Sequence, residues 1–120
     1  SIIEHDVSIG NGCRIHSNVF IPEFCVLEDH CWIGPGVVLT NAKYPHSPVT
    51  KQKLKGVVLR QGAIVGAGAI VLPGVVIGRR ALVGAGAVVV GDIPDGMVVV
   101  GNPARAIKHI SDIRDYEIQT

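Results

Sequence analysis

The stretch IEHDVSIGNGCRIHSNVFIPEFCVLEDHCWIGPGVVL, residues 3–39, carries an isoleucine or leucine at every sixth position. The same period returns in a new phase over residues 59–89. The large aliphatic residues of the two series are Ile3, Ile9, Ile15, Ile21, Leu27, Ile33, Leu39, Leu59, Val65, Val71, Ile77, Val83 and Val89. A fixed short period indicates a repeat architecture, and a period of six fits neither a heptad nor an amphipathic helix.

A second series of small residues follows the first at an offset of four. Its members are Val7, Cys13, Val19, Cys25, Cys31, Val37, Ala63, Ala69, Val75, Ala81 and Ala87. Glycines cluster beside both series, and glycine accepts the positive φ that a sharp corner needs. We therefore expect each hexad to form one short strand and a corner, with the large side chain pointing inward. Three hexads then close one triangular turn of a parallel β-solenoid.

The chain contains three cysteines, and all of them, Cys13, Cys25 and Cys31, fall in the small-residue series. This placement favours buried free thiols that pack as small apolar groups. The cysteines stand two hexads and then one hexad apart, which resembles no metal-ligand motif. A disulfide or metal site is therefore the less favoured interpretation, and we expect no metal. Buried free thiols are typical of a reducing compartment, which favours a cytoplasmic location.

Length and composition predict a single domain over residues 1–120. Its parts are coils at residues 3–39 and 59–94, a loop at 40–58 and a C-terminal cap at 95–120. The chain has no apolar stretch of about 20 residues and no start typical of a secretion signal, so we expect a soluble protein that does not bind membranes. The net charge of +1 argues against a general nucleic-acid binder.

Charge is unevenly distributed along the chain. Residues 30–91 contain no acid and seven bases, whereas the segments on either side carry net charges of −4 and −2. A cationic middle section in a nearly neutral protein favours an anionic ligand, and a solvated face without a ligand is the alternative.

The segment TNAKYPHSPVTKQKLKGVV, residues 40–58, interrupts the period. Its two prolines and four lysines predict a loop extruded from the solenoid, and long loops in compact repeats are commonly functional. In the tail, Ile107, Ile110 and Ile113 recur at every third position, which predicts a short helix that covers the last coil.

The tandem hexads, the extruded loop and the ending VVVGNPARAI together resemble the hexapeptide-repeat acyltransferases. This resemblance extends over about residues 3–110 and implies an all-β fold, a left-handed parallel β-helix. It also implies acetyl-CoA as the acetyl donor and a homotrimer with its sites in grooves between subunits.

A narrower resemblance lies in WIGPGVVLTNAKYPHSP, residues 32–48. It is similar to the branch of that family that N-acetylates amino sugars on nucleotide carriers, which has a Thr-Asn pair and a Tyr-Pro-Arg-like segment. Thr40-Asn41 and Tyr44-Pro45 match, and His46 stands where a basic residue such as arginine is common. The resemblance implies transfer of an acetyl group to the amine of a small acceptor, held by Asn41, Tyr44 and His46.

Acetyl transfer needs a nucleophile, which the acceptor supplies, and a route for its proton. His46 is the only histidine in the loop and is the leading candidate for the base, because imidazole titrates near neutral pH. It can instead bind the acceptor or be a solvated residue, and the leaving thiolate is a further proton acceptor. Asn41 can hold the acceptor or orient its amine, or serve as a turn residue.

Acetyl-CoA carries phosphates and a pantetheine arm, and the resemblance places it against the second block and the C-terminal segment. We expect corner backbone amides to bind the arm and basic side chains to bind the phosphates. The expected amides belong to Ala67, Gly68, Ala85 and Gly86, and the expected cations are Arg79, Arg80, Arg105 and Lys108.

Three alternative functions remain at this stage. The first is O-acetylation of a sugar or another small acceptor, although members with that chemistry often have a Thr-His pair where this chain has Thr40-Asn41. The second is a γ-class carbonic anhydrase, which needs three histidines on one zinc ion, two of them typically separated by five positions; this chain has no such pair. The third is a non-catalytic solenoid used for binding or assembly.

Overall fold

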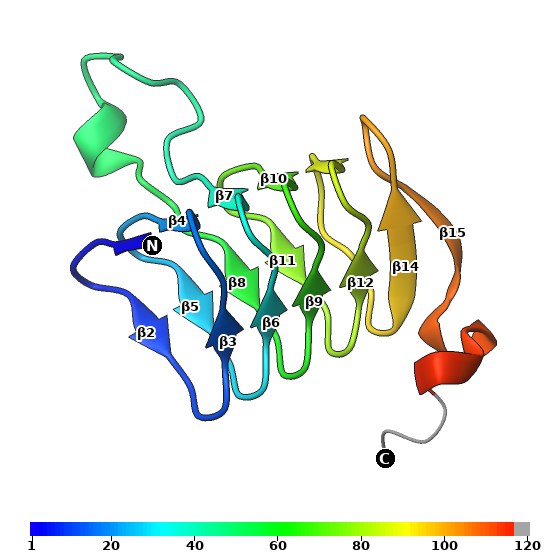
Figure 1. The fold of residues 1–120 in the computed structure, drawn as a ribbon. Coiled ribbons are helices and arrows are strands. Elements are labelled where there is room, and N and C mark those ends of the chain that lie inside the picture. Colours follow the sequence, from blue (N-terminus) through cyan, green and yellow to red (C-terminus); the bar gives the residue numbers. More distant parts are fainter. Residues whose placement is uncertain (117–120) are drawn as a thin grey trace.

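The computed structural model of the chain describes residues 1–116, which wind as a coil of short strands through three sheets in rotation (Figure 1). Sheet A contains β1 (Ile2–Ile3), β4 (Phe20–Ile21), β7 (Val38–Leu39), β10 (Ile70–Val71) and β13 (Val88–Val89). Sheet B contains β2 (Ser8–Ile9), β5 (Val26–Leu27), β8 (Val58–Leu59) and β11 (Val76–Ile77). Sheet C contains β3 (Arg14–Ile15), β6 (Trp32–Ile33), β9 (Ile64–Val65), β12 (Leu82–Val83), β14 (Met97–Val100) and β15 (Arg105–His109).

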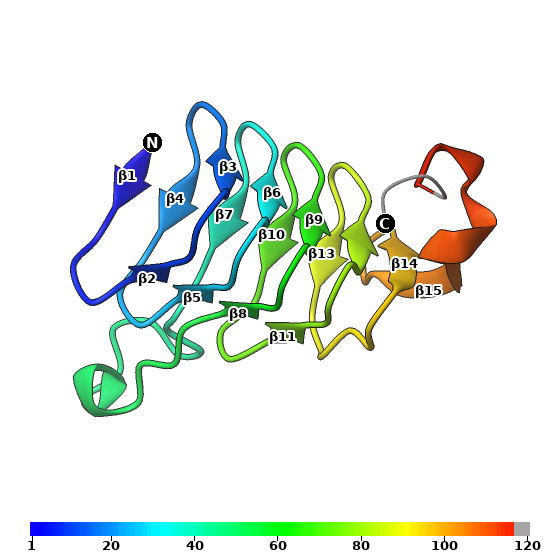
Figure 2. The same cartoon turned by 90° about the horizontal axis from the view of Figure 1, so that it is seen from below.

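The coil pairs each strand with the strand one turn later, in parallel, as predicted (Figure 2). Ile3 lies beside Ile21, so one turn consists of three hexads. Leu39 lies beside Val71, although three hexads from Leu39 would reach only as far as Val57, so the third turn contains an insertion. Beyond the insertion Val71 pairs with Val89, again three hexads on. The loop therefore enlarges one corner and leaves the stack intact.

Both residue series point into the coil, which confirms the prediction of a packed interior. Ile21, Leu27, Ile33, Leu39 and Leu59 are at most 1% exposed. The buried small residues from the second coil onward are Val19, Cys25, Cys31, Val37, Ala63, Ala69, Val75, Ala81 and Ala87. Each fully buried aliphatic side chain contributes about 1.5–3 kcal/mol relative to an exposed one. The three cysteines are free thiols, as expected; Cys25 and Cys31 are buried, whereas Cys13, in the first coil, is only half-buried.

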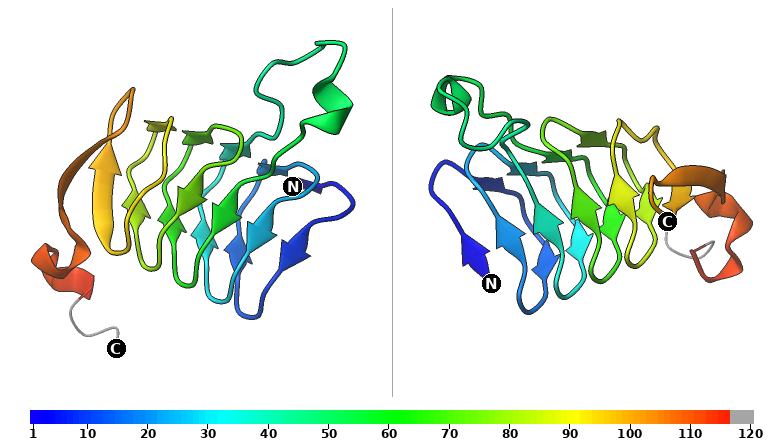
Figure 3. Two further views of the ribbon diagram at one scale, coloured as in Figure 1. Left: turned by 180° about the vertical axis from the view of Figure 1, so that it is seen from behind. Right: turned by 90° about the horizontal axis from the view of Figure 1, so that it is seen from above.

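The first coil departs from the expected burial. Ile3 and Ile9 belong to the inward series but are 46% and 39% exposed. They lie in the first coil of the stack, so neighbouring side chains cover them from one side along the axis (Figure 3).

The C-terminal cap is a hairpin followed by two single turns of 3-10 helix. Strand β14 extends sheet C in parallel with β12, and β15 returns antiparallel to β14. The predicted helix is realised as η2 (Ile110–Asp112) and η3 (Arg114–Tyr116), with Ile110 buried. Ile107 was wrongly expected to share that helix, because it lies in β15 and is 54% exposed. Residues 117–120 of the predicted cap lie outside the described residues. Among the residues described, no helix is long and apolar enough to cross a membrane.

The buried thiols yield a test of this packing. Burial is the main reason that the pKa of Cys31 is raised from 9.0 to about 12, and burial also raises the pKa of Cys25. Because the thiolate is the reactive form, we expect at most one thiol per native chain, that of the half-buried Cys13, to react with a chromogenic disulfide reagent at about pH 8. In urea all three should react.

The same shift has a consequence for stability. A thiol whose folded-state pKa is raised stabilises the fold fully below its unfolded pKa, and this contribution is lost as the pH rises toward the folded value. Urea unfolding should therefore show a Cys31-dependent loss of stability between pH 9.0 and about 12, absent in Cys31→Ala. In the labelling experiment described above, rapid reaction of two thiols in the native protein would contradict the burial of Cys25 and Cys31.

Candidate functional site

The three sheets meet at three corners, which we name A–B, B–C and C–A after the sheets they join. The predicted functional residues are distributed over all three corners. Residues 40–57 leave the stack at the A–B corner of the third turn, where they form the extruded loop with its short helix η1 (Thr50–Gln52) (Figures 1 and 3).

Hydrogen bonds within the loop give it a defined shape. At its base the backbone N–H of Lys55 donates to the carbonyl of Asn41 at 2.9 Å. Near its tip the hydroxyl of Thr50 donates to the carbonyl of Tyr44 at 2.7 Å and lies 2.9 Å from the hydroxyl of Ser47. The segment between Tyr44 and Thr50 is thus closed on itself before the chain returns to sheet B.

A cavity of about 240 Å³ lies between the loop and the A–B corner. Lys43, Lys53 and Lys55 line it together with Tyr44, and the ammonium nitrogen of Lys43 lies 5.5 Å from the centre of the Tyr44 ring. No acidic residue of the described chain lines the cavity. The cavity therefore suits an anionic group, and it collects three of the four lysines that sequence reasoning noted in the loop.

Asn41 stands where the loop leaves the stack, and its side chain is half-buried. Its amide nitrogen Nδ2 donates to the carbonyl of Glu23 on the preceding turn at 3.1 Å. Among residues 1–116 its Oδ1 has no hydrogen-bond donor. Asn41 thus anchors the loop and keeps one polar atom that can accept a hydrogen bond from a ligand.

His46 and Tyr44 are both exposed at the outer part of the loop. His46 has a φ of 65°, a left-handed conformation that is uncommon for residues other than glycine, although Asn, Asp and His adopt it more often than most. Within the described part of the chain its imidazole makes no hydrogen bond. A single subunit therefore places His46 outside the lysine-lined cavity and leaves one side of any site around it open.

The C–A corner carries bare backbone at three levels, where Gly36, Gly68 and Gly86 all have φ near +70°. A Cβ added to Gly68 or Gly86 would meet no atom within 4 Å. Their own amides are used inside the stack, donating to the carbonyls of Pro35 and Ala67. The exposed amides of Ala67 and Ala85 donate to no protein oxygen within residues 1–116. The two glycines thus provide open space and the two alanines provide the available donors.

The structure separates the four predicted cations into two groups. Arg105 lies opposite Val100, at the end of β14 that adjoins the C–A corner, and Lys108 lies further along β15 opposite Val98. Arg79 and Arg80 lie in the turn between β11 and β12, at the B–C corner. Sheet C separates this corner from Ala67 and Ala85, so these arginines and the alanine amides do not form one site in a single subunit.

Sheet A separates the loop from the C–A corner. Its strands alternate inward and outward residues, and the outward position is apolar at every level. We call these residues the sheet A stripe: Ile2, Phe20, Val38, Ile70 and Val88. Ile70 is 38% exposed although it lies mid-stack. An unbroken apolar stripe thus runs along the axis of the coil, between the two corners that carry the predicted donor and acceptor residues.

One cluster of possible metal ligands lies beside the loop base. Nδ1 of His5 lies 3.0 Å from Asp6, and Nε2 lies 3.4 Å from a carboxylate oxygen of Glu23. The hydrogen bond to Asp6, followed by the charge of Glu23, raises the pKa of His5. The cluster holds one histidine and is exposed, so within residues 1–116 the three-histidine site of a γ-class carbonic anhydrase is not formed.

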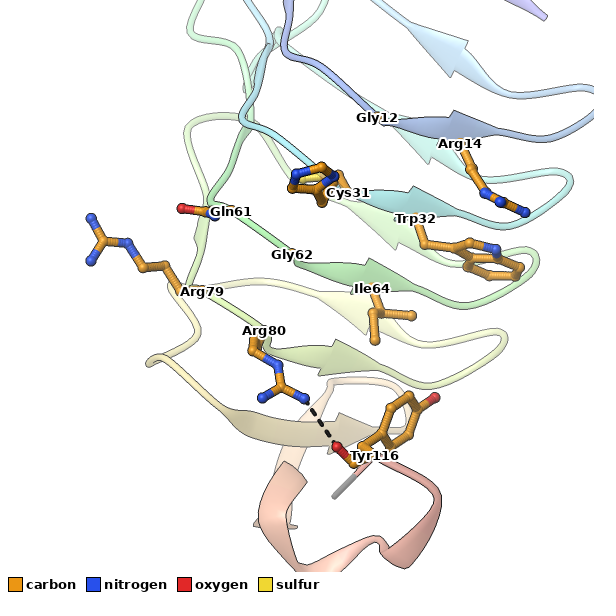
Figure 4. Close-up of a pocket in the computed structure, with 11 residues that line it drawn as sticks. Gly12, Arg14, Cys31, Trp32, Gln61, Gly62, Ile64, Arg79, Arg80 and Tyr116 are labelled. Atoms are coloured by element: carbon orange, nitrogen blue, oxygen red, sulfur yellow. Dashed lines mark hydrogen bonds between the residues drawn. The ribbon is translucent and has the colours of Figure 1, made fainter. Parts of the chain in front are cut away.

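A larger groove, of about 840 Å³, lies at the B–C corner (Figure 4). Sequence reasoning noted Arg79 and Arg80 there but not Trp32, His30 or Arg14, which also line it. The signal for this groove is spatial: Arg14, Trp32 and Arg80 belong to different turns and line one groove only after the coil has formed.

Comparison with known proteins places this fold among transferases. Residues 56–91 match the protein family described as bacterial transferase hexapeptide (six repeats). The chain is 39% identical over 113 residues to a galactoside O-acetyltransferase of Lactococcus lactis, covering 89% of this chain and 55% of that protein. It is 38% identical over 82 residues to a 2,3,4,5-tetrahydropyridine-2,6-dicarboxylate N-acetyltransferase of Alkaliphilus metalliredigens, covering 68% and 32%.

Solved structures give the same result. A variant of the GDP-perosamine N-acetyltransferase of Caulobacter crescentus, in complex with CoA and GDP-perosamine, superposes with a TM-score of 0.75 at 33% identity. The match covers 88% of this chain and 44% of that one. The chain thus spans about half the length, or less, of the relatives described here.

Proposed function

This chain belongs to the hexapeptide-repeat transferase family, whose left-handed parallel β-helix it adopts, and from that premise we propose that it is an acetyl-CoA-dependent acetyltransferase. The observation that carries the proposal is the C–A corner. It combines open space over Gly68 and Gly86, two unpaired amides at Ala67 and Ala85, and Arg105 at the adjoining end of sheet C.

These features fit the chemistry of the donor. A pantetheine arm carries amide groups that pair with backbone N–H groups, and side chains at Gly68 or Gly86 would obstruct its approach. The guanidinium of Arg105 suits a phosphate, because its N–H groups form a planar fork that binds two oxygens. Lys108, on the same strand, adds a second positive charge.

The acceptor is proposed to be a nucleotide-linked amino sugar. The lysine-lined cavity of the loop supplies positive charge for the nucleotide phosphates, and the GDP-perosamine enzyme is a relative with such an acceptor. Asn41, Tyr44 and His46 hold the sugar, with Oδ1 of Asn41 accepting a hydrogen bond from it. The relative from Lactococcus lactis, a galactoside O-acetyltransferase, keeps O-acetylation of a sugar as the second candidate.

The two halves of this site come together in a homotrimer. Sheet A separates the loop from the C–A corner in one subunit, so the loop of one copy must face the corner of the next. The sheet A stripe lies between these corners and provides the apolar surface for the contact. His46 is exposed in one subunit, and in the trimer it faces the C–A corner of the neighbouring subunit.

In this arrangement the acceptor amine attacks the thioester carbonyl, so that a C–N bond forms as the C–S bond breaks. His46 takes the proton from the amine nitrogen and returns it to the departing sulfur. Asn41 orients the amine through Oδ1.

The acetyl-transfer proposal is tested by incubating the protein with acetyl-CoA and a panel of nucleotide-linked amino sugars and simple sugars, while following thiol release. We expect turnover with an amino sugar. Arg105→Gln should raise KM for acetyl-CoA roughly tenfold with little change in kcat, because a charge-assisted hydrogen bond to phosphate is lost. Thiol release only with sugar hydroxyls would select O-acetylation, and no release with any acceptor would contradict the proposal.

The role of His46 is tested with two variants. His46→Ala and His46→Gly should each lower kcat by about 100-fold or more, because general-base catalysis contributes at least that factor. Glycine tolerates the φ of 65° at this position, so it separates loss of the imidazole from distortion of the loop. Unchanged turnover in both variants would remove His46 from the mechanism, and a loss confined to alanine would assign it a backbone role.

Assembly is tested at Ile70. Ile70→Asp places a charge in the middle of the sheet A stripe, so we expect light scattering to change from the mass of a trimer to that of a monomer, with loss of acetyl transfer. Val76→Asp, at an outward and half-buried position on sheet B, is the matched control and should remain trimeric. A monomeric parent protein with full activity would contradict the shared site.

A further inference from the structure

The groove at the B–C corner has the size and the lining of a ligand site that the acetyl-transfer proposal does not use. Its volume of about 840 Å³ lies in the range of pockets for small organic molecules. Arg14, Arg79, Arg80 and His30 line it, and no acidic residue of the described chain does. It lies across sheet C from the C–A corner and is separate from the loop cavity at the A–B corner.

Acids are present near this corner, but backbone amides engage them. Oδ1 of Asp29 accepts a hydrogen bond from the N–H of Asn11 at 2.7 Å, and Oδ1 of Asp95 accepts from the N–H of Arg79 at 2.8 Å. Glu28 accepts from the N–H of Gln61 at 3.0 Å. These contacts hold the carboxylates at the turns of the coil, and the groove itself keeps a net positive lining.

An aromatic surface accompanies the positive charge. Trp32 projects from the outward face of β6, between Arg14 on one side and Ile64 on the other (Figure 4). The ring of His16 packs against it in a tilted arrangement, with 4.7 Å between the ring centroids and 53° between the ring planes. Trp32 is only half-buried, so one part of the indole remains available to a planar ring.

Arg80 is held in place from outside its own turn. Its Nη2 donates to the carbonyl of Tyr116 at 3.4 Å, which orients the guanidinium along the groove toward η3 (Figure 4). One of its N–H groups is engaged in this way, and the remaining donors of the planar fork can bind an anion.

The backbone at this corner favours glycine, yet two levels carry large side chains. Gly12, His30, Gly62, Arg80 and Gly96 occupy equivalent positions on successive turns, and all have φ between 53° and 72°. A non-glycine residue in this region costs about 1–2 kcal/mol. The two residues that bear this cost, His30 and Arg80, both line the groove.

The intervening glycines make room for those two side chains. A Cβ at Gly12 would overlap the His30 ring, and a Cβ at Gly62 would approach Cγ of Arg80 to 3.2 Å. The corner is therefore arranged around the His30 and Arg80 side chains. We propose that the B–C groove binds a nucleoside phosphate, with the phosphate at Arg80 and the base against Trp32.

Trp32 is the only tryptophan of the chain, so its fluorescence reports directly on this groove. The full chain is titrated with AMP and UMP, and with adenosine and inorganic phosphate as the two separated parts. Saturable quenching by a nucleotide is expected, with at least roughly tenfold weaker binding of adenosine, because the charge-assisted hydrogen bonds are lost. Equal affinity for adenosine and AMP, or no quenching by either nucleotide, would overturn the proposal.

Variants locate the binding within the groove. Arg80→Gln should weaken AMP binding roughly tenfold. Arg60→Gln is the matched control at the same corner, because Arg60 lies 4.0 Å from Glu28 and does not line the groove, so its affinity should equal that of the parent. Arg80→Gly should lose affinity without a lower melting temperature, because glycine relieves the positive φ. Equal losses in Arg80→Gln and Arg60→Gln would overturn the assignment.

A nucleotide in this groove has two possible sources, a free nucleotide or the nucleotide end of CoA. Titrating AMP with and without saturating CoA distinguishes them, and a separate site predicts the same AMP affinity in both. Competition by CoA would overturn the proposal of a separate site. It would instead assign Arg79 and Arg80 to the binding of acetyl-CoA, as the sequence predicted. The titration uses no acetyl acceptor, so its result is independent of whether acetyl transfer succeeds.

Discussion

The backbone hydrogen bonds between successive turns are the constraint on which the rest of this structure depends. Each short strand of the coil pairs with a strand one turn later, and a strand so short has no stability of its own. The stack holds because every level presents the same inward side chains to the next, so hydrogen bonding and apolar packing repeat in register. Any change in the length of a turn must therefore be placed at a corner, where it does not shift the register. The insertion at the A–B corner, between Leu39 and Leu59, satisfies that condition.

This constraint also explains where polar chemistry can appear. The interior accepts only aliphatic side chains and small residues, and no polar or charged residue is buried within the described chain. Functional groups are therefore confined to outward strand positions, corners and the loop. The three corners differ in what they offer: the C–A corner exposes backbone amides beside glycines, the A–B corner carries the lysine-rich loop, and the B–C corner collects arginines and an indole. One regular scaffold thus presents three chemically different edges.

The loop and Asn41 of the proposed site could be predicted from the sequence, whereas the corner at which each residue lies could not. The loop was predicted because prolines and lysines interrupt a strict period, and Asn41 was noted because it stands at the interruption. Within one subunit the structure places Arg79 and Arg80 at a different corner from Ala67 and Gly68, because nearness in sequence does not tell which side of a triangular turn a residue faces. The predicted helix at Ile107 gave way to strand β15, because the unpaired edge of β14 offers hydrogen bonds that a helix would leave unmade.

The sequence by itself determined the coil, its turn of three hexads, the inward series, the buried thiols and the position of the loop. These are local and periodic properties, since a side chain's inward or outward direction follows from its place in the hexad. Only the tertiary structure decided which residues on different turns share a corner. It left the amides of Ala67 and Ala85 without an acceptor within residues 1–116, and it brought Arg14, Trp32 and Arg80 into one groove. The physical reason is that neighbours along the axis are set by strand pairing. That pairing joins Ile3 to Ile21 across a regular turn but Leu39 to Val71 across the turn that carries the loop.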